Sequence, residues 1–182
     1  RPDYSFLSEE QGYIPGKNKD KCFVIDPLDG TINFLRGSSA WCISVALKEK
    51  DVTTLGVVYD PIKNEIFIAE KGRGAFCNGK RMRASKVKNL EDALIVSSRL
   101  DPVKLSKISD TCIGLRKIGS IALSLCYTAA GIYDVFISNE NLKEWDTLAG
   151  MLIAEEAGCM ISKNIKTMVS NIEISPVSYT HL

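Results

Sequence analysis

Short runs of β-branched and aromatic residues, separated by Asp, Gly, Pro and Asn, dominate the first half of the chain. Such runs are typical of strands, and the residues between them are typical of turns. Asn78-Gly79 indicates a two-residue hairpin turn, because both residue types accept a positive φ. We predict strands over residues 22–25, 41–47, 52–59, 65–69 and 93–96.

The pattern changes to a helical period after residue 92. Helices are predicted over 103–111, 120–130 and about 147–157, with a strand over 133–137 between the last two. Gly131 and Gly158 follow two of these helices and are typical C-terminal stops. We therefore expect an α/β protein with three parts, an antiparallel-sheet half, an α/β half and a tail that no pattern places: 1–92, 93–162 and 163–182.

Composition narrows the class of protein without identifying it. The chain has 182 residues, 45% hydrophobic and 25% charged, and a net charge of +1, which indicates a globular unit with a sizeable core. The near-zero charge gives no electrostatic footprint for nucleic acid or an anionic membrane. No apolar run approaches the roughly 20 residues of a membrane span, and no basic-then-apolar leader opens the chain.

The cysteines and the single histidine exclude several kinds of chemistry. Six cysteines are scattered without C-x-x-C spacing, which favours buried reduced thiols in a cytoplasmic protein over a disulfide framework. His181 is the penultimate residue, so mechanisms that need a core imidazole are disfavoured, among them Ser-His-Asp triads and His-ligated zinc. Carboxylates must therefore carry any catalysis.

The run D-P-L-D-G-T at residues 26–31 is the strongest chemical signal. It follows an apolar segment and places two carboxylates and a hydroxyl where we expect that strand to end. Hard divalent cations bind such oxygens, and a glycine turn can bring backbone N–H groups close to a phosphate. Alone, the run could be an ordinary turn, since Asp, Pro and Gly are turn formers. However, S-E-E at 8–10 and W-D-T-L-A-G at 145–150 offer further acids for one shared site.

With these three motifs in this order, the chain resembles the inositol monophosphatase family, the magnesium-dependent, lithium-sensitive phosphatases of small phosphorylated polyols and sugars. The resemblance also runs through 56–61, 72–79 and 114–119, so it covers most of residues 6–162. It implies the layered α-β-α-β-α sandwich shared with fructose-1,6-bisphosphatase. It further implies two to three Mg²⁺ ions, inhibition by Li⁺, a small phosphorylated substrate, and a homodimer when the chain is full length.

The resemblance also assigns roles to individual residues. The metal ligands would be four carboxylates and one backbone carbonyl: Glu9, Asp26, Asp29, Asp146 and Leu28. In the catalytic pair that the resemblance implies, Glu9 would serve the metal that holds the attacking water, and the Thr31 hydroxyl would orient that water. Phosphate and substrate would contact Asp29, Gly30, Thr31, Ser120, Asn139 and Asp146.

Each acid also has an ordinary structural interpretation. Glu9 and Glu10 could be a solvated surface pair, and Asp146 could be the N-cap of the helix that follows it. A capping carboxylate retains lone pairs for a cation, so Asp146 could be both an N-cap and a metal ligand.

Departures from the family pattern leave the substrate open. Asn139 stands where a glutamate commonly contacts polyol hydroxyls, and Ile121 stands where alanine is usual. Family members place a further aspartate upstream, where it pairs with the threonine that corresponds to Thr31. That aspartate is not in this chain. The alternatives are a relative acting on fructose bisphosphate or on a nucleotide 3′-phosphate, or a non-catalytic member that binds the transcription machinery.

Other phosphate signatures fit less well. The segment 77–83 matches C-x₅-R of cysteine phosphatases, but Asn78-Gly79 within it indicates a hairpin. The segment 74–80 imitates G-x₄-G-K, yet Arg81 replaces the Ser or Thr that would bind Mg²⁺.

Both ends of the chain look incomplete beside the family. Helices would precede Arg1, and a closing strand and a further helix would follow Ser162. We therefore expect exposed sheet edges and apolar surface, marginal stability, and stabilisation by Mg²⁺.

Overall fold

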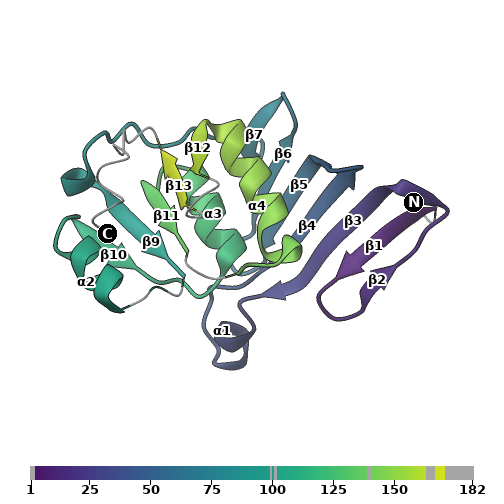
Figure 1. Cartoon of the computed structure of the whole chain (residues 1–182), viewed down its shortest axis with the longest axis horizontal. Coiled ribbons are helices and arrows are strands. Elements are labelled where there is room, and N and C mark those ends of the chain that lie inside the picture. Colours follow the sequence, from purple (N-terminus) through teal and green to yellow (C-terminus); the bar gives the residue numbers. More distant parts are fainter. Residues whose placement is uncertain (1–2, 99, 101, 139–140, 163–166, 171–182) are drawn as a thin grey trace.

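The computed structural model describes residues 3–98, 100, 102–138, 141–162 and 167–170. Within them, two β-sheets enclose a pair of helices (Figure 1). The larger sheet has the order β2-β1-β3-β4-β5-β6-β7-β8. Its strands are β1 Tyr4–Ser8, β2 Gly12–Ile14, β3 Asn18–Asp29, β4 Cys42–Glu49, β5 Val52–Asp60, β6 Glu65–Glu70, β7 Gly74–Cys77 and β8 Lys80–Arg81.

The smaller sheet is mixed and has the order β10-β9-β11-β13-β12. β9 pairs in parallel with β10 and with β11, while β13 is antiparallel to both of its neighbours. Its strands are β9 Leu94–Ser97, β10 Gly114–Arg116, β11 Val135–Ile137, β12 Cys159–Ser162 and β13 Thr167–Ser170. The sequence left residues 163–182 unplaced, whereas the structure forms β13 within that stretch.

Four α-helices and one 3₁₀ turn complete the described part of the chain. They are α1 Thr31–Leu35, α2 Pro102–Ser109, α3 Ile121–Ala129, α4 Glu144–Ala157 and the 3₁₀ turn Leu90–Asp92. α3 and α4 contact each other and lie between the sheets, with α4 against β4, β5, β6 and β7 and α3 against β11 and β13. α2 lies outside the smaller sheet, beside β10.

The main core fills the space between the larger sheet and the two central helices. Phe67 and Val58 from the sheet and Leu123, Leu125 and Ile153 from the helices are at most 1% exposed. Eight of the nine residues of α3 are buried, as expected for a helix that is covered on every side. A second cluster, under α2, joins Ile95, Val135 and Ile108.

Two glycines let α4 approach its neighbours closely. A Cβ on Gly56 of β5 would lie 2.7 Å from the carbonyl oxygen of Ala149, and a Cβ on Gly150 would lie 2.7 Å from Cβ of Leu125. Ala149 and Gly150 end the W-D-T-L-A-G motif, so these two of its six residues serve helix packing.

Most of the predicted elements are present, with shifted limits. β3 continues through Asp26 to Asp29, with a register shift between these residues, so the acids lie within the end of the strand and not in a turn after it. α4 begins at Glu144, with Lys143 as its N-cap, which corrects the assignment of Asp146 to that position. The predicted hairpin at Asn78-Gly79 is confirmed: φ is 48° and 76° at these residues, and Cys77 pairs with Lys80.

The strands of the larger sheet all come before position 92, and those of the smaller sheet all come after it. Both sheets nevertheless pack against α3 and α4. The division of the chain at residue 92 therefore stays a prediction. No helix in the described residues is long and apolar enough to cross a bilayer.

Candidate active site

The predicted acids lie where strands of the larger sheet end and α4 begins. β1 runs parallel to β3 with Ser8 opposite Ile25, and the Glu9 amide donates to the Ile25 carbonyl at 3.2 Å. This register brings Glu9, which is exposed, alongside Asp26, which is 2% exposed. Pairing with β4 sets Asp26 opposite Ser44 and Asp29 opposite Cys42.

Asp29 is the most firmly held of these carboxylates. Its Oδ2 accepts hydrogen bonds from the Ser120 hydroxyl at 2.6 Å and from the Ala122 amide at 2.7 Å. The Cys42 thiol lies 3.7 Å from the same oxygen and 3.6 Å from the Ser120 hydroxyl oxygen. Ser120 also caps α3 by accepting from the Leu123 amide at 3.2 Å. One serine therefore joins a strand of the larger sheet to the start of a central helix.

Burial dominates the electrostatics of the two central acids. Desolvation raises the pKa of Asp26 to about 7, a hydrogen bond from the Leu28 amide opposes this, and the charges of Asp29 and Glu9 add to it. Burial also raises the pKa of Asp29, against the hydrogen bonds from Ser120 and Ala122, and the Asp146 charge raises it further. Both acids would therefore gain from a nearby cation.

Among the described residues, which include Glu9, Asp26, Asp29 and Asp146, no three His, Cys, Asp or Glu side chains are arranged to hold a metal ion together. Asp146, in the first turn of α4, accepts from the Lys143 amide at 2.8 Å. The convergence of all four acids on metal ions stays a prediction.

The Thr31 hydroxyl donates to the Leu28 carbonyl at 3.1 Å. The predicted water-orienting hydroxyl and the predicted carbonyl ligand are thus neighbours at the start of α1. Gly30 precedes the helix with φ 96°, and a Cβ there would lie 2.8 Å from the Ala40 carbonyl oxygen. Asn139, the remaining predicted substrate contact, lies outside the described residues.

Sequence reasoning missed two residues at this site. Asn33 joins α1 to the loop before α3 through hydrogen bonds to the carbonyls of Ala40 and Ile118. A polar residue within the short apolar segment 32–35 was an available signal for it. Cys42 lies in an apolar strand and offered none. All six cysteines are free thiols, as predicted, but only Cys42, Cys126 and Cys159 are buried.

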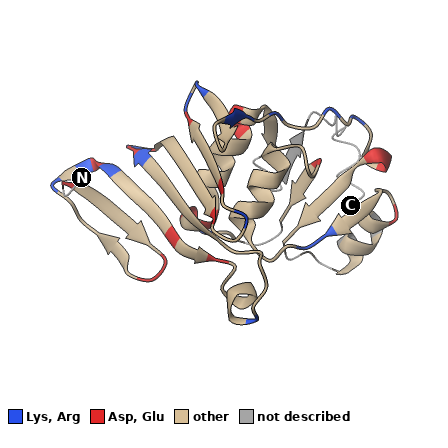
Figure 2. Cartoon of the chain, turned by 180° about the vertical axis from the view of Figure 1, so that it is seen from behind, with Lys and Arg blue, Asp and Glu red and all other residues tan. Residues whose placement is uncertain are grey.

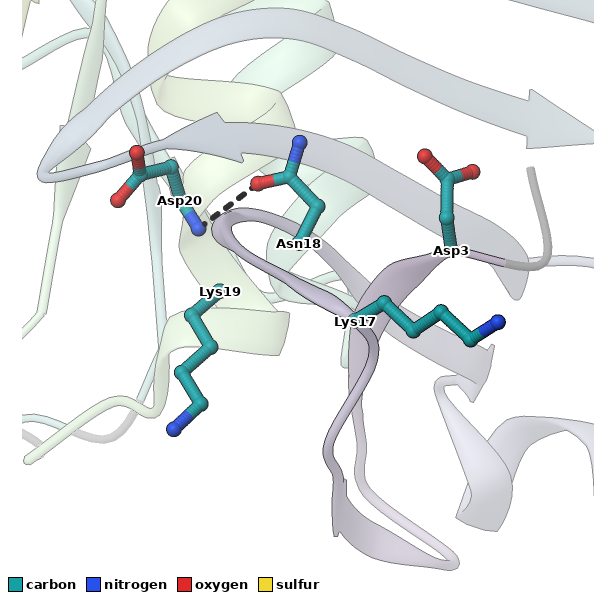
Figure 3. Close-up of a pocket in the computed structure, with 5 residues that line it drawn as sticks. All are labelled: Asp3, Lys17, Asn18, Lys19 and Asp20. Atoms are coloured by element: carbon teal, nitrogen blue, oxygen red, sulfur yellow. Dashed lines mark hydrogen bonds between the residues drawn. The ribbon is translucent and has the colours of Figure 1, made fainter.

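Charge and a hollow elsewhere in the described residues were compared with this site. Figure 2 shows Lys and Arg scattered over hairpins and loops, with no continuous basic face in this view. An open hollow of about 540 Å³ near the chain start is lined by Asp3, Lys17, Asn18, Lys19 and Asp20. In Figure 3 the two lysine side chains extend away from each other, and the one hydrogen bond drawn is local, from the Asp20 amide to the Asn18 side chain.

Comparison with known proteins defines the class. The model of the inositol monophosphatase family matches residues 1–170, and the chain belongs to this family. Its fold is the layered α/β sandwich of inositol monophosphatases and fructose-1,6-bisphosphatases.

Three relatives illustrate the similarity. The Nus factor SuhB of Pasteurella multocida is 40% identical over 169 residues, which are 88% of this chain and 63% of the relative. The chain thus spans less than two thirds of the length of that curated relative. The crystal structure of the extragenic suppressor protein suhB from Bartonella henselae has a TM-score of 0.89 at 37% identity, covering 95% of this chain and 76% of that one. An IMPase/NADP phosphatase complexed with NADP and Ca²⁺ has a TM-score of 0.82 at 26% identity, covering 94% and 72%.

Proposed function

We propose that the protein is a Mg²⁺-dependent phosphoric monoester hydrolase that acts on a small phosphorylated polyol or sugar, such as inositol 1-phosphate. The observation that carries this proposal is the pair of buried carboxylates at the end of β3. Asp26 is 2% and Asp29 8% exposed, and no ion pair to either is found in the described part of the chain. Buried acids without a counter-charge are costly unless a cation neutralises them.

The donor atoms fit Mg²⁺. The carboxylates of Glu9, Asp26, Asp29 and Asp146 and the carbonyl of Leu28 supply only oxygen, which hard divalent cations prefer. When bound, Mg²⁺ would neutralise charge on the phosphate and lower the pKa of a coordinated water. The complex of a structural neighbour with NADP and Ca²⁺ supports a divalent cation in this fold.

The chain's own groups would orient the reactants. The Glu9 carboxylate would hold the attacking water by accepting a hydrogen bond, and the Thr31 hydroxyl, already directed at the Leu28 carbonyl, would fix that water's position. The Gly30 and Thr31 amides would donate to phosphate oxygens. Ser120 would act through Asp29, to which its hydroxyl donates, and Asn139 would contact the substrate's hydroxyl groups.

The test is phosphate release by the full chain with Mg²⁺, comparing Asp26→Asn with Cys77→Ser. We expect Asp26→Asn to abolish turnover because it removes the charge of a predicted metal ligand, and Cys77→Ser to retain nearly all of it. A folded but inactive Cys77→Ser protein would favour the cysteine mechanism instead. Parallel assays with fructose 1,6-bisphosphate and a 3′-phosphonucleotide separate the enzymatic alternatives. Millimolar Li⁺ should inhibit the reaction if the family chemistry operates.

A second candidate is binding to the transcription machinery. It is supported by the name Nus factor, which the Pasteurella relative carries at 40% identity. The two functions separate in the Asp26→Asn variant, whose sheet is expected to remain formed. If the variant binds purified RNA polymerase and the wild type shows no turnover, the binding role is favoured. Turnover without polymerase binding would favour the enzyme.

We also propose a cytoplasmic location and a homodimer for the complete protein. Six free thiols support the first, since reducing compartments preserve thiols. The second follows from the family alone and is tested by light scattering during size-exclusion chromatography.

A further inference from the structure

The side chain of Asn33 connects two loops that come from different sheets. Its Nδ2 group donates to the Ala40 carbonyl at 2.7 Å and to the Ile118 carbonyl at 2.9 Å. Ala40 precedes β4 of the larger sheet, and Ile118 follows β10 of the smaller one. A single primary amide has two N–H bonds, and here each has an acceptor.

Two glycines allow close contacts around this amide and around its acceptor. Gly119 has φ 86°, and a Cβ on it would lie 2.8 Å from Nδ2 of Asn33. On the other side, the Ala40 carbonyl lies 2.8 Å from the position of a Cβ on Gly30, which also has positive φ. A side chain at Gly119 would meet the Asn33 amide itself, and one at Gly30 would meet the Ala40 carbonyl that this amide binds.

The held loop leads directly to Asp29. Ser120 is two residues after Ile118, and its hydroxyl donates to Asp29 Oδ2 at 2.6 Å. The Ala122 amide donates to the same oxygen at 2.7 Å. Asp29 is itself four residues before Asn33 in the chain. These links form a closed ring, from Asp29 along the chain to Asn33, across to Ile118, along to Ser120 and back to Asp29.

We propose that Asn33 is a positioning residue for the phosphatase reaction, acting through this ring to fix the orientation of the Asp29 carboxylate. The inference deepens the proposed function and rests on it. A carboxamide is required because two carbonyl acceptors need two donors on one short side chain. An aspartate of the same shape offers acceptors to both carbonyls and would repel them.

The test compares Asn33→Asp with Asn78→Asp in the full chain. Asn78 is the matched control, because its Nδ2 also donates to a backbone carbonyl, that of Asn64 at 3.0 Å, in the turn between β7 and β8. The first measurement needs no metal: hydrogen exchange of the Ala122 amide followed by NMR. The second is steady-state hydrolysis of inositol 1-phosphate with Mg²⁺.

We expect Asn33→Asp to speed exchange of the Ala122 amide about tenfold, as the loss of an ordering hydrogen bond implies. We expect its kcat to fall about 10- to 100-fold with KM changed less than threefold, because a displaced ligand impairs the reaction more than substrate capture. Asn78→Asp should match the wild type in both. A purely structural role for Asn33 would lower Tm and leave kcat unchanged.

Unchanged exchange and unchanged kcat in a folded Asn33→Asp protein would overturn the inference. If this variant does not fold, Asn33→Ala, which removes the donors without adding repulsion, is measured in the same two ways and decides the question. If the wild type shows no phosphatase activity, the proposed function fails. The exchange rates then still decide whether Asn33 orders Asp29.

Discussion

Ser120→Ala is predicted to destabilise the fold because Ser120 has two structural roles. Its oxygen accepts from the Leu123 amide at 3.2 Å as the N-cap of α3, and its hydroxyl donates to Asp29 at 2.6 Å. Loss of an N-cap costs about 1 kcal/mol. Loss of a hydrogen bond to a charged group costs about 1.5–3 kcal/mol. Because the Ala122 amide still donates to Asp29, we expect a total near the lower end, about 2–3 kcal/mol.

The measurement is chemical unfolding in urea without metal. For a chain of this size, a loss of about 2–3 kcal/mol lowers Tm by roughly 4–12 °C. Ser124→Ala is the matched control: the same change, one turn further along α3, at a buried serine whose hydroxyl donates only to the Ser120 carbonyl at 2.6 Å. We expect it to cost about 1 kcal/mol. Equal losses for the two variants would show that the Asp29 contact contributes nothing, and the reasoning would be wrong.

Three further predictions concern packing, pH and thiols. Gly56→Ala should cost about 1–3 kcal/mol in urea unfolding, because its Cβ would meet the Ala149 carbonyl at 2.7 Å; a stabilised variant would contradict the close contact. Burial raises the pKa of Asp26 from 3.8 to about 7, so the contribution of Asp26 to stability declines as pH rises from about 4 to 7. Mg²⁺ that binds this carboxylate must displace its proton. The rise in Tm on adding millimolar Mg²⁺ should therefore be larger at pH 8 than at pH 6, and the opposite trend would refute this. Cys126, fully buried, should react with an aromatic disulfide reagent only after unfolding, whereas half-buried Cys112 should react in the native protein; equal native rates would contradict the packing.

The sequence predicted several of the longer elements, because hydrophobic alternation reports burial on one face. β4, β5 and β6 were found for this reason, but only residues 22–25 of the 12-residue β3 were found. Short strands were found unevenly: β9 and β11 were predicted, whereas β10 and β12, of three and four residues, were not. α4 was placed three residues late because Trp145 and Asp146 were read as preceding it, whereas the Lys143 amide and the Asp146 carboxylate bond across its first turn.

The sequence suggested the acids of the candidate site, whose role stays a prediction, and did not suggest their hydrogen-bond partners. Asp26 and Asp29 were candidates because two carboxylates beside a glycine turn suggest a cation, although the same run alone could be an ordinary turn. The bond from Ser120 to Asp29 joins residues 91 positions apart, and the bond from Asn33 to Ile118 joins residues 85 apart. Contacts of this kind depend on how the two sheets pack on α3 and α4, which local patterns do not encode.

The glycine contacts of α4 have a consequence for which cation the protein would accept. Asp146 lies on the first turn of a helix whose backbone is seated against β5 at Gly56 and against α3 at Gly150. A helix held in this way cannot slide without disturbing both neighbours, so the reach between Asp146 and the end of β3 is set by the interior of the protein. Mg²⁺ needs oxygen atoms at about 2.0–2.1 Å, and Ca²⁺ accepts about 2.3–2.6 Å. Discrimination between ions of different radius would then be a property of helix seating, and substitutions far from any ligand could change it.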